Sequence, residues 1–197
     1  LFIISAYIYG SKQTSSSTQK KGHDSTKKNT KNTDDVGRTQ LHIAVRDNSI
    51  EIAKLLIENK TNIDAKDKYG WTPLHFAAKV NSIDIAKLLN DNKANIEATD
   101  NCGNTPLHYA AGRNSVEIAK LLIENNANIE AKDEDGESPL HKTTYNNSID
   151  VAKILIDNKI NIEAKDKDER TPLHHTAQKN SIEVTKILID NKANIEA

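Results

Sequence analysis

The chain has 197 residues, with 27 Lys and Arg against 28 Asp and Glu, so its charges nearly cancel. This balance gives no general case for binding nucleic acid or an anionic membrane surface. Aromatic residues make up only 4% of the chain and there are only 7 glycines, which favours helices packed through aliphatic side chains over a β-sandwich.

Cys102 is the single cysteine, so neither an internal disulfide nor a multi-cysteine zinc site can form. A reducing compartment is compatible with this, and we expect an intracellular, cytoplasmic location, with a membrane-tethered or secreted protein as the alternative. The sequence contains no Met, and we expect it to be a fragment or a processed product.

Residues 1–33 divide into an apolar start and a polar linker. The start, LFIISAYIY at 1–9, is shorter than the about 20 residues that a transmembrane helix needs. It reads either as the end of a signal sequence or membrane helix, or as a stray strand or helix end. Residues 11–33 are Ser, Thr, Lys and Asn with almost nothing apolar, so we expect a disordered linker.

The rest of the chain repeats one tetrapeptide at a fixed spacing. It reads Thr-Pro-Leu-His at 72–75, 105–108 and 171–174, Ser-Pro-Leu-His at 138–141, and Thr-Gln-Leu-His at 39–42. Each copy begins 33 residues after the previous one. A period of this size is typical of stacked repeats, in which each unit buries its apolar face against its neighbours.

The unit at 67–99 predicts a turn followed by two helices. Its first four residues, Asp-Lys-Tyr-Gly, suit a type I turn. Thr72 suits a helix N-cap and Pro73 the first helical position, where a missing N–H costs nothing. Asn81 should end this helix, because Asn tolerates the left-handed conformation, and Ser82 should cap the second helix.

The period and the tetrapeptide together resemble the ankyrin repeat, over residues 34–197. The resemblance implies an all-α solenoid of helix-turn-helix units with β-hairpin fingers, with the first helices lining a concave side and the second helices outside. The repeats would be 34–66, 67–99, 100–132, 133–165 and 166–197. The His of each tetrapeptide would bridge neighbouring repeats. The residues given this structural role are Thr72, Pro73, His75, Thr105, Pro106, His108, Pro139, His141, Thr171, Pro172 and His174.

Some positions depart from the family pattern. Gln40 replaces Pro in repeat one, and Thr143 and Thr144 replace an Ala pair in repeat four. Glu169 lies where the finger glycine is expected. If that position needs a positive φ, Glu there costs on the order of 1 kcal/mol.

No pattern in the repeats predicts catalysis, a cofactor or a metal site. Helices pack about 8–10 Å apart, whereas zinc–nitrogen bonds are about 2 Å, so histidines on successive repeats are too far apart to share an ion. The adjacent His174 and His175 should point to different faces of one helix. We find no phosphate-binding glycine loop and no HExxH motif.

The resemblance therefore implies a non-catalytic protein–protein interaction scaffold that binds a partner protein through its finger tips and concave helices. We expect no nucleic-acid partner and no small-molecule substrate, and membrane association only through the N-terminal apolar segment. The alternative is the recognition domain of a larger enzyme or channel. Carrying over the family's usual contact positions predicts these partner-binding residues: Arg38, Lys68, Tyr69, Trp71, Lys79, Arg113, Glu134, Asp135, Glu137, Tyr145 and Arg170.

Two features of that set suggest where the partner binds. Tyr69 and Trp71 flank the glycine of one finger, and Trp and Tyr are enriched in binding hot spots; alternatively, Trp71 only covers the neighbouring finger. Charge also differs along the array, because the first repeats carry Arg and Lys at these positions and repeat four carries Glu134, Asp135 and Glu137. We expect a partner of opposite polarity, acidic against the first repeats and basic near repeat four.

Overall fold

The structure is a computed structural model that describes residues 33–196, and each repeat contributes two helices. The first helices are α2 (Gln40–Arg46), α4 (Pro73–Val80), α6 (Pro106–Arg113), α8 (Pro139–Thr143) and α10 (Pro172–Lys179). The second helices are α3 (Ile50–Glu58), α5 (Ile83–Asp91), α7 (Val116–Glu124), α9 (Ile149–Asp157) and α11 (Ile182–Asp190).

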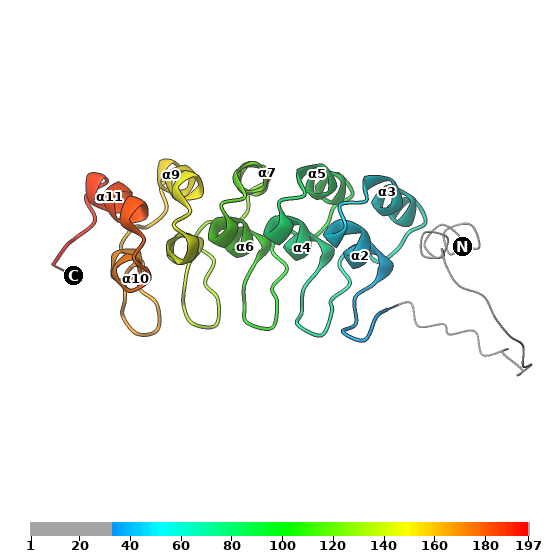
Figure 1. The fold of residues 1–197 in the computed structure, drawn as a ribbon, viewed down its shortest axis with the longest axis horizontal. Helices are drawn as coiled ribbons and strands as arrows, with labels where there is room; N and C mark the ends of the chain where they lie inside the picture. Colours follow the sequence, from blue (N-terminus) through cyan, green and yellow to red (C-terminus); the bar gives the residue numbers. More distant parts are fainter. Residues whose placement is uncertain (1–32, 197) are drawn as a thin grey trace, which may run out of the picture. The chain divides into compact units, whose positions relative to one another are not determined.

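The helix pairs stand side by side in chain order (Figure 1). The first helices form one layer and the second helices another, and the fingers extend from the first-helix layer away from the second (Figure 1). Within 33–196 the isolated β-pairing is a single antiparallel bridge between Thr33 and Thr39. The all-α repeat fold is thus confirmed. The predictions on residues 1–32 lie outside the described part of the chain, while Thr33, expected in the linker, pairs with repeat one.

Small and aliphatic side chains make a continuous core between the two layers. Leu74 and Ala77 of α4 are fully buried, as are Ile85 and Leu89 of α5. Burying a Leu or Ile side chain stabilises a fold by about 1.5–3 kcal/mol. Ala at the helix contacts lets the backbones approach closely. Among helices of the described residues, none is long and apolar enough to cross a bilayer.

A hydrogen bond from a histidine side chain links each of the first four repeats to the next. The backbone N–H of Thr72 donates to His75 Nδ1 over 3.1 Å. Because Nδ1 accepts this bond, the ring proton is on Nε2, which donates to the carbonyl of Asn104 on the next finger, 3.0 Å away. The same pairs recur from His42 to Trp71 (2.9 Å), from His108 to Glu137 (3.1 Å) and from His141 to Arg170 (3.2 Å).

Repeat four departs from the others because threonine occupies the Ala positions. Thr143 Oγ1 donates to the carbonyl of Leu140 over 2.7 Å, and Thr144 Oγ1 donates to the carbonyl of His141 over 2.8 Å. Thr176 makes the same bond as Thr143, to the carbonyl of Leu173, and α10 nevertheless continues to Lys179. The difference in repeat four is therefore Thr144, whose hydroxyl competes for a backbone acceptor that a continuing helix uses. The α-helix α8 accordingly stops at Thr143 and passes into a 3₁₀ turn, η1 (Thr144–Asn146).

The finger position expected to hold glycine has a positive φ in every repeat. Gly37, Gly70, Gly103 and Gly136 have φ between 78° and 80°, and Glu169 has φ 61°. A Cβ added at Gly70 would lie 2.6 Å from the backbone nitrogen of Asn101 on the next finger. Among the described residues no finger follows Glu169, so its Cβ has no neighbouring finger to clash with. The cost at this position is the strain of the left-handed backbone alone.

Gly70→Ala is expected to destabilise the array more than Gly37→Ala does. Both residues share the same φ, so both variants bear about 1 kcal/mol of left-handed strain. The Cβ at Gly37 would meet its nearest atom at an ordinary 3.4 Å, whereas the clash at Gly70 should add about 1–3 kcal/mol. Urea denaturation followed by circular dichroism measures both losses. Equal losses would show that the fingers separate without cost.

Candidate partner-binding surface

A groove of about 310 Å³ lies on the first-helix layer where α4, α6 and α8–η1 come together. Its side chains include Lys79 from α4, Tyr109 and Arg113 from α6, and Tyr145 from η1. Gly112 also lines the groove and contributes no side chain to fill it. With Lys142 of α8, the groove thus combines three cationic side chains with two tyrosine rings, which are residue types suited to binding a peptide.

Aromatic rings from repeats two and three build one wall of this surface. Trp71 packs edge-on against Phe76 and Tyr109, with ring centroids 5.0 and 4.5 Å away. The Lys79 ammonium lies 4.3 Å from the centroid of Trp71. Tyr109 donates its hydroxyl to Asp100 Oδ2 over 2.5 Å. Burial first, then this hydrogen bond, raises the pKa of Tyr109, so the ring is fixed and uncharged.

In repeats four and five, the position that holds Phe76 and Tyr109 in repeats two and three holds Lys142 and His175. Lys142 lies 2.5 Å from both Asp133 Oδ2 and Glu137 Oε2. Tyr145 donates to Glu137 Oε1 over 2.8 Å. Burial alone would lower the pKa of Lys142, but the two carboxylates outweigh it and raise that pKa. Both carboxylates are almost fully buried, so Lys142 is their compensating charge.

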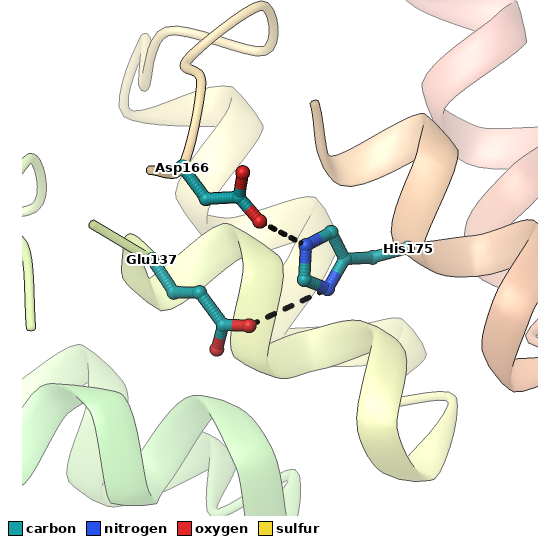
Figure 2. Close-up of side chains that lie close together, drawn as sticks. All are labelled: Glu137, Asp166 and His175. Carbon is teal, nitrogen blue, oxygen red and sulfur yellow. Dashed lines mark hydrogen bonds and ion pairs between the residues drawn. The ribbon is translucent and has the colours of Figure 1, made fainter. Parts of the chain in front are cut away.

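His175 joins these two repeats through carboxylates on both sides of its ring. Figure 2 shows Glu137, Asp166 and His175 pointing toward one another. His175 Nε2 lies 2.8 Å from Asp166 Oδ2, and Nδ1 lies 3.6 Å from Glu137 Oε1. Arg170 also binds Asp166 Oδ2, 2.9 Å away. Burial alone would raise the pKa of Asp166, but the hydrogen bonds from His175 and Arg170 hold it well below its usual range.

Glu137, Asp166 and His175 are close enough for one metal ion to reach all three. Their donor atoms do not suit it. Both oxygens of Glu137 already accept from Tyr145 and Lys142, and Asp166 Oδ2 accepts from Arg170. A divalent ion would displace these donors and lie beside two cationic side chains, which opposes binding. We therefore describe this cluster as a structural contact between repeats four and five.

Most of the predicted partner-binding residues reach the surface. Tyr69 is 57% exposed and Tyr145 43%. Lys68, Lys79, Arg113, Glu134 and Asp135 are also exposed. Trp71, Arg38 and Arg170 are half-buried, the first within the aromatic wall and the other two beside the finger aspartates Asp67 and Asp166.

Glu137 is the exception, because its side chain is buried and bound by Lys142 and Tyr145. It therefore contributes nothing to an acidic surface in repeat four, and the expected polarity there depends on Glu134 and Asp135 alone. Among the residues given a structural role, His174 is exposed and bonds only to Thr171 of its own repeat, over 2.9 Å, so within residues 33–196 it bridges no neighbouring repeat.

Lys142 and His175 were not identified from the sequence. They occupy the repeat position that holds Phe76 and Tyr109 in the two preceding repeats. In repeats three to five this residue binds the finger aspartate of its own repeat: Tyr109 to Asp100, Lys142 to Asp133 and His175 to Asp166. The change from Phe and Tyr to Lys and His at one repeat position was the available signal.

A family model described as ankyrin repeats (3 copies) matches residues 11–100, 41–133, 92–166 and 108–197. Among curated proteins no sequence matches the chain significantly. Ankyrin repeats generally serve as protein–protein interaction modules and are typically non-catalytic. The overlapping matches span most of the chain, and the helix pairs, fingers and bridging histidines agree with them. The chain belongs to the ankyrin-repeat family.

Proposed function

We propose that this array is a non-catalytic scaffold that binds a partner protein through the groove between α4, α6 and α8–η1 and through the neighbouring finger tips. The observation that carries the proposal is the groove itself, where exposed Tyr145, Lys79 and Arg113 surround a floor left open by Gly112. Tyr69 extends the same surface at a finger tip.

Substitutions at Gly112 test the groove without touching its charges. An added Cβ would meet its nearest atoms at an ordinary 3.7 Å, so Gly112→Ala should fold normally. In a helix this change even stabilises by about 0.5–1 kcal/mol. Gly112→Leu adds a side chain large enough to fill the groove, and the Ala variant is its matched control.

A library of random peptides displayed on phage would be selected on the wild-type array. We expect the enriched peptides to bind wild type and Gly112→Ala alike and to lose binding to Gly112→Leu. Circular dichroism would establish that all three proteins are folded. Enriched peptides that bind all three equally would place the binding surface elsewhere. A selection that enriches no peptide would contradict the proposal as well.

A further inference from the structure

Three cations along the first-helix layer make no ion pair with a carboxylate of the described residues. They are Lys79, Arg113 and Lys179, in the last turns of α4, α6 and α10. By contrast, Arg46 in the last turn of α2 binds Asp47 over 2.8 Å. Unpaired cations gathered on one face attract an anionic partner.

Aromatic rings hold two of these cations in place. Lys79 lies 4.3 Å from the centroid of Trp71, and Lys179 lies 4.4 Å from that of Tyr145. Partial burial lowers the pKa of Lys79, and the neighbouring positive charges of Arg113 and Arg38 lower it further. Positive neighbours therefore dominate the electrostatic surroundings of Lys79.

The groove itself has an unbalanced charge. Its described lining includes no Asp or Glu. Lys142 is already neutralised by Asp133 and Glu137. Burial lowers the pKa of His108 to about 4, so that ring is neutral at pH 7. Lys79 and Arg113 remain as the surplus positive charge.

We propose that the groove binds an acidic stretch of the partner protein, whose carboxylates pair with Lys79 and Arg113. This inference rests on the proposed function and adds the chemistry of the partner. The tyrosine rings of the groove offer apolar surface to side chains beside the carboxylates.

Nucleic acid fits this surface less well. Trp71 packs edge-on against Tyr109 with centroids 4.5 Å apart, and Lys79 lies over the Trp71 ring, so Trp71 is not free to stack on a base.

The basic residues also lie at helix C-termini, where a positive charge stabilises the helix. Binding has to be separated from this structural effect. Lys79→Gln/Arg113→Gln removes both charges, and Lys54→Gln/Lys87→Gln removes two exposed lysines from the second-helix layer as a matched control. Urea denaturation would establish how stable each variant is.

The probes are fluorescein-labelled octapeptides in which leucine is combined with glutamate, glutamine or lysine, together with an oligothymidine of matched charge. Fluorescence anisotropy measures their affinity. The glutamate peptide should bind wild type about tenfold more tightly than the glutamine peptide does, and Lys79→Gln/Arg113→Gln should lose that difference. Raising the salt from about 0.05 M to about 0.5 M should weaken binding of the glutamate peptide. The control variant should bind like wild type.

Equal affinity for the glutamate and glutamine peptides would overturn the acidic-partner inference. Tighter binding of oligothymidine or of the lysine peptide would overturn it as well. If neutral peptides from the phage selection bind in a manner blocked by Gly112→Leu, the proposed function stands even though this inference fails. If Gly112→Leu has no effect on any peptide, the proposed function fails too.

Discussion

Lowering the pH from 7 to about 4 is expected to reduce the free energy of unfolding by about 3 kcal/mol through His108 alone. Burial lowers the pKa of His108 from 6.5 to about 4, and each pKa unit corresponds to about 1.4 kcal/mol. Burial also lowers the pKa of His42, His75 and His141. The bridging histidines therefore act in the same direction.

The direction of this pH effect depends on whether the folded or the unfolded chain binds more protons. The unfolded chain protonates these histidines as the pH falls through 6.5, whereas folded His108 stays neutral until about pH 4. Between these values the unfolded state binds more protons, so acid favours unfolding. Geometry explains the resistance of the folded state, because His108 Nδ1 accepts from the Thr105 N–H over 3.1 Å and has no room for a proton.

Urea denaturation at pH 7.5, 6 and 5 would measure the part of this loss that falls above pH 5. His108→Gln should be less stable than wild type at pH 7.5 but should lose less stability on acidification. His174→Gln is the control, because His174 is exposed and bonds to no other repeat. It should keep the wild-type pH dependence. Stability that stays constant between pH 7.5 and 5 would contradict the prediction.

The second large effect is expected for Lys142→Met, which should lower the free energy of unfolding by about 3–5 kcal/mol. The variant keeps most of the side-chain volume and removes the charge. It leaves Asp133 and Glu137, 2% and 4% exposed, without the ammonium that lies 2.5 Å from each. Since the pKa of Lys142 is raised, its stabilising contribution is fully present below its ordinary pKa of 10.5 and is lost as the pH rises from there through the raised value.

Lys120→Met is the matched control for this prediction. Lys120 pairs with Glu117 over 3.1 Å, but both side chains are about half exposed, so the pair contributes only about 0–1 kcal/mol. Urea denaturation at pH 7.5 compares the two variants. A cost for Lys142→Met as small as that for Lys120→Met would mean that water reaches Asp133 and Glu137.

The repeat fold could be predicted from the sequence because local interactions determine it. Capping Thr, Pro at the first helical position and glycine at the finger each act within a few residues, so one unit of 33 residues predicts the next. The resemblance to the ankyrin repeat also implied the bridging histidines, and in the first four repeats their partners lie 29 residues further on. Glu169 was predicted to be strained if its φ were positive, and it has φ 61°.

Tertiary structure alone decided which of the variable residues are available to a partner. Glu137 and Glu134 look equivalent in sequence, yet Glu137 is buried against Lys142 and Tyr145 while Glu134 is exposed. The difference arises because the residues that contact Glu137 come from α8 and η1, which follow it in its own repeat, and from the next repeat. Likewise, His175 meets Glu137 only when repeats four and five stack, whereas its other partner, Asp166, belongs to its own repeat. The spacing of residues along a chain fixes contacts within a repeat, but burial and charge pairing depend on which side chains the neighbouring repeat brings to the same place.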